Sequence, residues 1–375
     1  MQYTSPSGTD AEPGPAHHGD AHRGDAHRSE AGAPGWDAIN HALNRVYPRQ
    51  SPWHSSAPPG SAAPLPGISA YKRITPLPHW HFVTYGFSEL FDKRNDDAAT
   101  SGYGFELTFR LANPDDAEEP PRWALNFLQN LARYVFDSGH GFHAGHYLSA
   151  GGPIAADSDS QIRALAFVQD PELAPVDSDN GRLEFLQIVG LTNEEEFALK
   201  RWSTLKVLEV FHDRLPLWIT DLERGSLLAD PDVAARLAEG SAREGSSVGT
   251  IYADHVSWEQ RKRLLRAPVT VLALSARQVG ELLALLPLRL PFGHAFSAIG
   301  PDARVVFEPA ARGNEALVVD GVLHLRLDER AMRSLVQRLR AQAGTYEVEG
   351  FPALEVQVCA ESRRPRGPPT PRRGR

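Results

Sequence analysis

Apolar and polar residues alternate along several segments of the chain, and a period of two predicts β-strands. Residues 79–85 (HWHFVTY) alternate and are rich in aromatic and β-branched side chains, which pack well on a pleated sheet. Residues 104–111 (GFELTFRL) place large apolar side chains on one face and Glu106, Thr108 and Arg110 on the other. Further strands are expected in this half of the chain at residues 165–167, 183–191 and 218–221.

Apolar residues spaced by three and four positions predict helices between these strands. Residues 123–136 form an amphipathic pattern that follows two prolines and ends near Gly139. Thr192 and Glu195 have the spacing of a capping box, so a helix is expected to begin there and to continue to about residue 212. Other helices are expected at residues 230–239, 276–286 and 329–342.

The second half of the chain mixes short strands with helices. A strongly charged run at 259–266 is interpreted as a connector between two domains. Strands are expected around it at residues 250–258, 269–275, 288–292, 305–308, 317–319, 322–327 and 354–358. Because strands and helices follow no strict βαβ period, the predicted class is α+β. We expect two mixed α/β domains, an N-terminal one at 67–258 and a smaller C-terminal one at 259–360.

The two ends of the chain have compositions typical of disorder, because they carry few large apolar side chains. Residues 1–66 are interpreted as a disordered tail and linker, with a tandem GDAHR repeat at 19–28 and a short helix at 35–49. Residues 361–375 contain six arginines and four prolines. This composition predicts a solvated, disordered basic tail.

Composition narrows the function classes. The 375 residues suffice for two domains, and the single Cys359 excludes an internal disulfide framework and any cysteine-based zinc or iron–sulfur site. A net charge of -8 supplies no basic field for nucleic acid or an acidic membrane. The chain shows no secretory signature and no apolar run of about 18 residues, so we expect a cytoplasmic protein with neither a nucleic-acid nor a membrane partner.

Histidines are the candidates for metal or catalytic chemistry. His140, His143 and His146 lie in a glycine-rich segment, and three imidazoles suffice for an open zinc site. The spacing of four that would place two of them on one helical face is absent, so loop histidines are the simpler interpretation. His79 and His81 share one face of a predicted strand. No G-x-S-x-G elbow or phosphate loop occurs, so no catalytic residue, metal or cofactor is expected.

Several aromatic-rich strings resemble the suppressor of fused (SUFU) family. The first is PHWHFVTYGFSEL at residues 78–90, the opening of the family's domain. The strings that follow it in the same order are SGYGFELTFRL at 101–111, LARYVF at 131–136, FLQIVG at 185–190 and WITDL at 218–222. The resemblance therefore covers residues 78–224, and a weaker likeness to the family's C-terminal domain follows.

The resemblance implies a two-domain, non-enzymatic binding protein. Animal members hold a peptide of a zinc-finger transcription factor between their domains as an added strand, a mode in which backbone hydrogen bonds supply affinity. Carried over to this chain, the expected partner-binding residues are Tyr134, His146, Val269 and Val271, with a free strand edge at 269–272. The resemblance also implies that His79 and His81 are structural, hydrogen-bonded residues.

Two departures from the animal pattern bear on the partner. His146 follows Gly145, where animal members have an aspartate, so a carboxylate is missing from the expected surface. The long acidic, serine-rich insertion of animal members is absent between Trp258 and Pro268. The animal partner is therefore not assumed for this chain.

The composition and the resemblance together favour one function over two alternatives. Abundant Ala, Arg, Gly and Pro with few Lys and Met is typical of a GC-rich bacterial gene, and bacterial proteins that resemble this family are commonly immunity proteins that bind and block a toxin. The partner is thus expected to be a protein or peptide. The alternatives are a regulator that sequesters a transcription factor and a metal-dependent enzyme that uses His140, His143 and His146.

Overall fold

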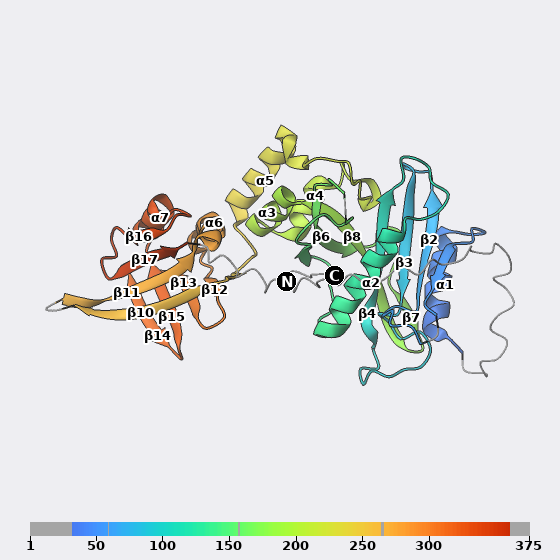
Figure 1. Ribbon diagram of the computed structural model, residues 1–375, viewed down its shortest axis with the longest axis horizontal. Coiled ribbons are helices and arrows are strands. Elements are labelled where there is room, and N and C mark those ends of the chain that lie inside the picture. Colours follow the sequence, from blue (N-terminus) through green and yellow to red (C-terminus); the bar gives the residue numbers. More distant parts are fainter. Residues whose placement is uncertain (1–31, 59, 157, 264–265, 361–375) are drawn as a thin grey trace, which may run out of the picture. The chain divides into compact units, whose positions relative to one another are not determined.

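The computed structural model describes residues 32–58, 60–156, 158–263 and 266–360 (Figure 1). The chain divides into two units, which we describe separately. The first unit comprises Met1–Glu196 and Leu208–Asp230, and the second comprises Phe197–Val207 and Pro231–Arg375. The predicted tails at 1–31 and 361–375 lie outside the described residues.

A mixed sheet forms the centre of the first unit, with strand order β1-β2-β3-β4-β8-β6-β5 and with β7 paired to β8. The strands are β1 (Trp53–Ser56), β2 (Gly67–Arg73), β3 (His79–Tyr85), β4 (Thr100–Ala112), β5 (Tyr147–Ser149), β6 (Ile162–Gln169), β7 (Val176–Ser178) and β8 (Gly181–Thr192). Neighbouring strands are antiparallel except β4 and β8, which are parallel. The strands predicted at 79–85, 104–111, 165–167 and 183–191 are confirmed.

Two helices cover opposite faces of this sheet. Helix α2 (Arg122–Ser138) packs on an apolar cluster that includes Phe82, whereas α1 (Pro34–Val46) packs on a cluster that includes Val83. Because successive side chains of a strand point to opposite faces, these neighbours in β3 assign one face to each helix. The helix predicted at 35–49 is therefore confirmed, but it belongs to the first unit's core and not to a tail or linker.

The capping box predicted at the start of the next helix is confirmed. The Thr192 amide donates to the Glu195 carboxylate at 2.8 Å, and the Glu195 amide donates to the Thr192 hydroxyl at 3.3 Å. The single helix expected beyond it is divided into α3 (Asn193–Arg201) and α4 (Thr204–Phe211). The strand expected at 218–221 is wrong: a 3-10 turn, η1 (Pro216–Trp218), precedes one isolated bridge at Thr220.

The second unit contains a four-stranded and a five-stranded sheet, ordered β10-β11-β17-β16 and β14-β15-β13-β12-β9. The strands are β9 (Thr250–Tyr252), β10 (Val256–Arg263), β11 (Arg266–Ser275), β12 (Phe296–Ile299), β13 (Arg304–Pro309), β14 (Glu315–Val319), β15 (Val322–Leu327), β16 (Gly344–Glu347) and β17 (Leu354–Cys359). The helices and turns of this part are α5 (Pro231–Glu244), α6 (Ala276–Leu285), η3 (Leu286–Leu288), η4 (Leu290–Phe292) and α7 (Glu329–Arg338). One apolar cluster joins Leu272 of one sheet to Phe307 of the other, so the two sheets share a core.

Two predictions in the second half of the chain are wrong. Residues 288–292 are 3-10 turns and not a strand, because Pro287 and Pro291 cannot donate to a ladder. Most of the charged run at 259–266 belongs to β10 and is not a connector. The side chains of Glu259, Arg261 and Lys262 are exposed, while Val256 at the start of β10 is buried, which is the pattern of a strand at the edge of a sheet.

The α+β class is confirmed, and the described residues divide at a different place from the one expected. The sequence placed the division after residue 258, whereas the chain's contacts assign Phe197–Val207 and the residues from Pro231 onward to the second unit. One short strand, β1, also precedes residue 67 and pairs with β2. The sequence-based boundary misses this strand because small and polar residues separate it from the apolar runs.

Two helical glycines of the second unit provide a test of this packing. A Cβ at Gly240 in α5 would lie 2.3 Å from the Trp202 ring, whereas a Cβ at Gly280 in α6 would meet no atom within 4 Å. We expect Gly240→Ala to lower the free energy of unfolding by about 1–3 kcal/mol through overpacking. The matched Gly280→Ala should raise it by about 0.5–1 kcal/mol, because alanine favours a helix. Urea denaturation of both variants measures the difference, and equal stabilisation would contradict the packing of α5 on Trp202.

Candidate functional site

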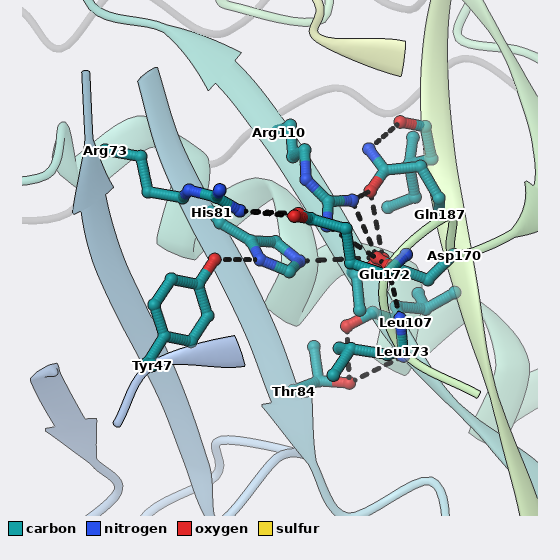
Figure 2. Close-up of polar contacts among 12 residues, drawn as sticks. Tyr47, Arg73, His81, Thr84, Leu107, Arg110, Asp170, Glu172, Leu173 and Gln187 are labelled. Carbon is teal, nitrogen blue, oxygen red and sulfur yellow. Dashed lines mark hydrogen bonds and ion pairs between the residues drawn. The ribbon is translucent and has the colours of Figure 1, made fainter. Parts of the chain in front are cut away.

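A network of charged and polar side chains lies on the face of the first unit's sheet opposite α2 (Figure 2). Arg110 of β4 is completely buried, and its guanidinium binds both carboxylate oxygens of Asp170 at 2.7 and 3.1 Å. It also donates to Glu172 at 2.9 Å and to the Gln187 side chain. Asp170 accepts further bonds from the Thr108 hydroxyl at 2.6 Å and from backbone amides. Arg110 is therefore the centre of a bidentate buried ion pair.

His81 connects this network to the chain segment after α1. The Tyr47 hydroxyl lies 2.6 Å from its Nδ1, and Asp170 lies 3.3 Å from its Nε2. Burial and the nearby Arg110 charge lower the pKa of His81 to about 4, so the ring is neutral at pH 7. Burial raises the pKa of Asp170, but the His81 contact and the Arg110 charge outweigh it and hold that pKa well below its usual range.

The types of residue in this network suit catalysis, but its burial does not. The side chains of His81, Arg110 and Asp170 expose no surface to solvent, so a substrate has no access to them. At the rim Arg73 binds the partly exposed Glu172 at 2.6 Å. His79 is also buried and bonds the Leu77 carbonyl, which confirms the structural role implied for both strand histidines.

Removal of the central carboxylate tests the importance of this network. Asp170→Asn leaves the Arg110 charge buried with Glu172 as its remaining carboxylate partner. We expect the free energy of unfolding to fall by about 3 kcal/mol or more. Asp177→Asn is the matched control, because its exposed pair with Arg182 at 3.3 Å should be worth less than about 1 kcal/mol. Chemical denaturation measures the free energy of unfolding of both variants. Similar losses would show that the buried ion pair contributes no more to stability than the exposed one.

Glu106 is a second buried charge, and no basic side chain accompanies it. Its carboxylate accepts hydrogen bonds from the Ser88 hydroxyl at 2.6 Å, the Gly86 amide at 2.8 Å and the Thr84 hydroxyl at 2.7 Å. Burial raises the pKa of Glu106 to about 7, and these donors offset only part of that effect. The side chain therefore changes its protonation state near neutral pH.

This raised pKa predicts a dependence of stability on pH. The folded state retains a proton on Glu106 up to about pH 7, whereas in an unfolded chain the group releases it near pH 4.5. Its stabilising contribution is thus complete below about pH 4.5 and is lost as the pH rises through about 7. Glu106→Gln imitates the protonated acid. Relative to the unmodified chain, the variant should gain up to about 3 kcal/mol between pH 5 and pH 8 in denaturation measurements.

Glu223→Gln, at an exposed position of the same unit, is the control and should follow the unmodified chain at every pH. A constant difference between Glu106→Gln and the unmodified chain from pH 5 to pH 8 would show that Glu106 does not titrate in that range.

The predicted partner-binding residue Tyr134 lies on the outer face of α2. Its ring is 44% exposed and stacks on Phe142 at 5.9 Å between centroids. Phe142 stacks in turn on Phe167 of β6 at 4.1 Å. An exposed aromatic ring is thus held by a column of rings that reaches the core, which reduces the conformational entropy it would lose on contact with a partner.

His146 is exposed and directly precedes β5, the last strand of the first unit's sheet. Its carbonyl accepts a hydrogen bond from the Phe167 amide at 3.0 Å, and the amide of Gly145 donates to the Phe167 carbonyl at 2.8 Å. Gly145 has a φ of 90°, which favours glycine. Tyr134 and His146 are therefore connected through Phe167, the former by way of the Phe142 ring and the latter by a backbone hydrogen bond.

Among the described strands, β5 pairs with β6 alone. The His146 carbonyl and the Ala150 amide form hydrogen bonds with β6. Leu148 lies midway between them, so its backbone groups also face β6. Because the backbone direction alternates along a strand, the Ser149 amide points away from β6. Sequence reasoning did not assign a strand at this edge because β5 has three residues.

The expectation of a free edge at 269–272 is wrong. Strand β11 pairs with β10 on one side and with β17 on the other, so it lies inside its sheet. Val269 and Val271 are buried, with 3% and 2% of their surface exposed. The long apolar run that suggested an edge is instead typical of a strand covered on both faces. Their role in partner binding stays a prediction, and these two valines belong to the second unit.

The remaining candidates for chemistry are dispersed. The rings of His143 and His146 lie edge to face with 5.2 Å between their centroids. Among the described ring contacts, none joins His140 to either of them. Within the part of the chain that the structure describes, no group of three or more His, Cys, Asp or Glu side chains could hold a metal ion. Across the same residues, no helix combines the length and the apolar character that a membrane crossing requires.

Comparison with known proteins identifies the domain. Residues 61–225 match the family model described as Suppressor of fused protein (SUFU). The Suppressor of fused homolog of Homo sapiens is 33% identical over 251 residues, a match that covers 61% of this chain and 51% of the human protein. The Mus musculus homolog gives the same values. The chain thus spans about half the length of these relatives, and it carries a suppressor of fused domain.

Solved structures share the fold of this chain. Drosophila Suppressor of Fused matches with a TM-score of 0.72 and 20% identity, over 88% of this chain and 98% of the Drosophila chain, which shows a common fold for most of the protein. A chain of the Sufu–Fu complex matches with a TM-score of 0.51 and 30% identity, over 55% of this chain and 97% of that chain. The resemblance expected over residues 78–224 is therefore confirmed.

Proposed function

We propose that this suppressor of fused protein acts by binding another protein and not by catalysis, as a cytoplasmic immunity protein that neutralises a toxin. The observation that carries the proposal is the exposed edge of β5 together with Tyr134 and His146, within a domain whose relative occurs in the Sufu–Fu complex. The polar groups that suit catalysis are buried in the sheet, where they stabilise the fold.

The proposed binding mode is the addition of a partner strand to β5. An edge strand offers backbone donors and acceptors to an incoming chain, and these give affinity with little dependence on sequence. The Ser149 amide is directed toward such a strand. Tyr134 would then contact side chains of the partner, since aromatic rings of this kind supply a large contact area at low entropic cost.

The charge of the chain supports a basic partner. A net charge of -8 complements a cationic toxin domain, such as a nuclease, and speeds their association by electrostatic steering. The alternative is a regulator that sequesters a transcription factor. The Sufu–Fu complex is compatible with both functions, because in it a related chain takes part in a complex. No observation favours the enzyme based on His140, His143 and His146.

Proline substitution tests strand addition at β5. Ser149→Pro removes the outward amide but keeps the bonds of the inner ladder, so the fold should persist while partner binding is lost. Ser149→Ala keeps the amide and should bind normally. The measurement is affinity capture from a native lysate, with tagged full chains and quantitative mass spectrometry. Partners that both variants recover equally would contradict strand addition at this edge.

The immunity role requires a separate readout. The gene that neighbours the one for this chain is expected to encode the toxin, and co-expression of the chain should restore the growth of cells that produce it. Ser149→Pro should abolish this rescue, and Ser149→Ala should retain it. If the neighbouring gene encodes a transcription factor that the chain binds, the regulator is the correct function.

A further inference from the structure

Two hollows of the first unit adjoin each other away from the β5 edge. The larger has a volume of about 930 Å³ and lies between α1 and the β7–β8 hairpin. The smaller has a volume of about 530 Å³ and lies over the loop that joins β3 to β4. Phe91 and Asp92 line both hollows, which therefore meet at these two residues, and we call the pair of hollows the groove.

The larger hollow is acidic. Its ionised lining consists of four aspartates and one arginine: Asp37, Asp92, Asp177, Asp179 and Arg45. Asp177 pairs with the exposed Arg182, and Arg45 bonds the His41 ring. Among the residues that the structure describes, no ion pair involves Asp37, Asp92 or Asp179. The hollow therefore has unneutralised negative charge and complements a cation.

The smaller hollow is mainly apolar and contains an exposed aromatic ring, and Glu89, Asp92 and Arg94 also line it. Phe91 is 44% exposed, and its inner side stacks on Trp36 at 6.5 Å between centroids. Phe87, Leu90 and Tyr103 complete the apolar wall. A large exposed ring beside an apolar wall is a feature of surfaces that bind apolar side chains.

The loop that carries Phe91 is held in place from both sides. Glu89 accepts hydrogen bonds from the amides of Arg94 and Asn95 at 2.6 and 2.5 Å. Lys93 donates to the carbonyls of Thr100 and Asn180 at 2.5 and 3.0 Å. The groove is thus preformed, and a ligand need not order it on binding.

We propose that this groove binds an extended basic segment of a protein partner, with arginine or lysine in the acidic hollow and an apolar or aromatic residue against Phe91. The chain's own N-terminal segment has the wrong charge for this role. Residues 1–31 contain two arginines and five acidic residues. A separate cationic segment is the occupant whose charge complements the groove.

The binding of synthetic peptides tests this assignment. The probe is a fluorescein-labelled peptide of sequence GRRFRRG, measured with the full chain by fluorescence anisotropy at low salt. We expect micromolar affinity, weakened about tenfold by the double variant Asp92→Asn, Asp179→Asn and by higher salt. Asp115→Asn neutralises an exposed aspartate elsewhere in the unit and should leave affinity unchanged.

A second comparison tests the role of Phe91. Phe91→Ala should weaken GRRFRRG about tenfold and should have little effect on GRRARRG, which lacks the aromatic residue. The proposal would be overturned if the acidic peptide GEEFEEG bound as tightly as GRRFRRG. It would also be overturned if Asp115→Asn weakened GRRFRRG binding as much as Asp92→Asn, Asp179→Asn does. Circular dichroism of each variant establishes that its fold persists, and Asp92→Asn, Asp179→Asn retains every described ion pair.

Two other occupants are outcomes that would also overturn the proposal. A chain that ends at Ala360 lacks the arginine-rich tail, and tighter peptide binding by that chain would show that the tail fills the groove. A dimer that Phe91→Ala dissociates, measured by analytical ultracentrifugation, would show that a second copy fills it. Ser149→Pro should bind GRRFRRG normally, so a failure of strand addition at β5 and a failure of this groove are distinguishable.

Discussion

The burial of the Arg110 guanidinium is the constraint on which the first unit depends. An arginine cannot release its charge at physiological pH, so a fully buried one must be paired within the fold. The pairing draws Asp170 and Glu172 from the segment after β6 and, through His81, fixes Tyr47 after α1. The residues that stabilise the buried Arg110 charge therefore also cover the second face of the sheet.

Local patterns predicted the elements of this arrangement but not their partners. The alternation of β4 correctly separates Glu106 and Arg110 from the apolar face, and the Thr192–Glu195 capping box is complete within four residues. The burial of both faces depends on α1 and on Asp170, which is 60 residues away from Arg110. Only the packed chain determines such contacts. The part of β10 after Trp258 was missed for the opposite reason, because its charges are those of a solvent-facing edge.

The candidate site shows the same division between local and long-range information. Family strings led to Tyr134 and His146, and the structure joins them through Phe167, a connection that no spacing in the sequence indicates. The same strings led to Val269 and Val271, but an apolar run does not distinguish an edge from a central strand. The sequence does not reveal the acidic groove, because its wall is built from three separate segments: α1, the loop after β3 and the β7–β8 hairpin.

Backbone recognition and charge recognition solve different parts of partner choice. An edge strand accepts almost any extended chain, so β5 alone cannot separate one partner from another. Selectivity needs side-chain contacts that a wrong partner fails to make or makes at a cost. An acidic groove with a fixed aromatic ring imposes such a cost on acidic segments and rewards basic ones. A protein that blocks one target in a crowded cell therefore benefits from both surfaces, with affinity supplied at the edge and discrimination supplied at the groove.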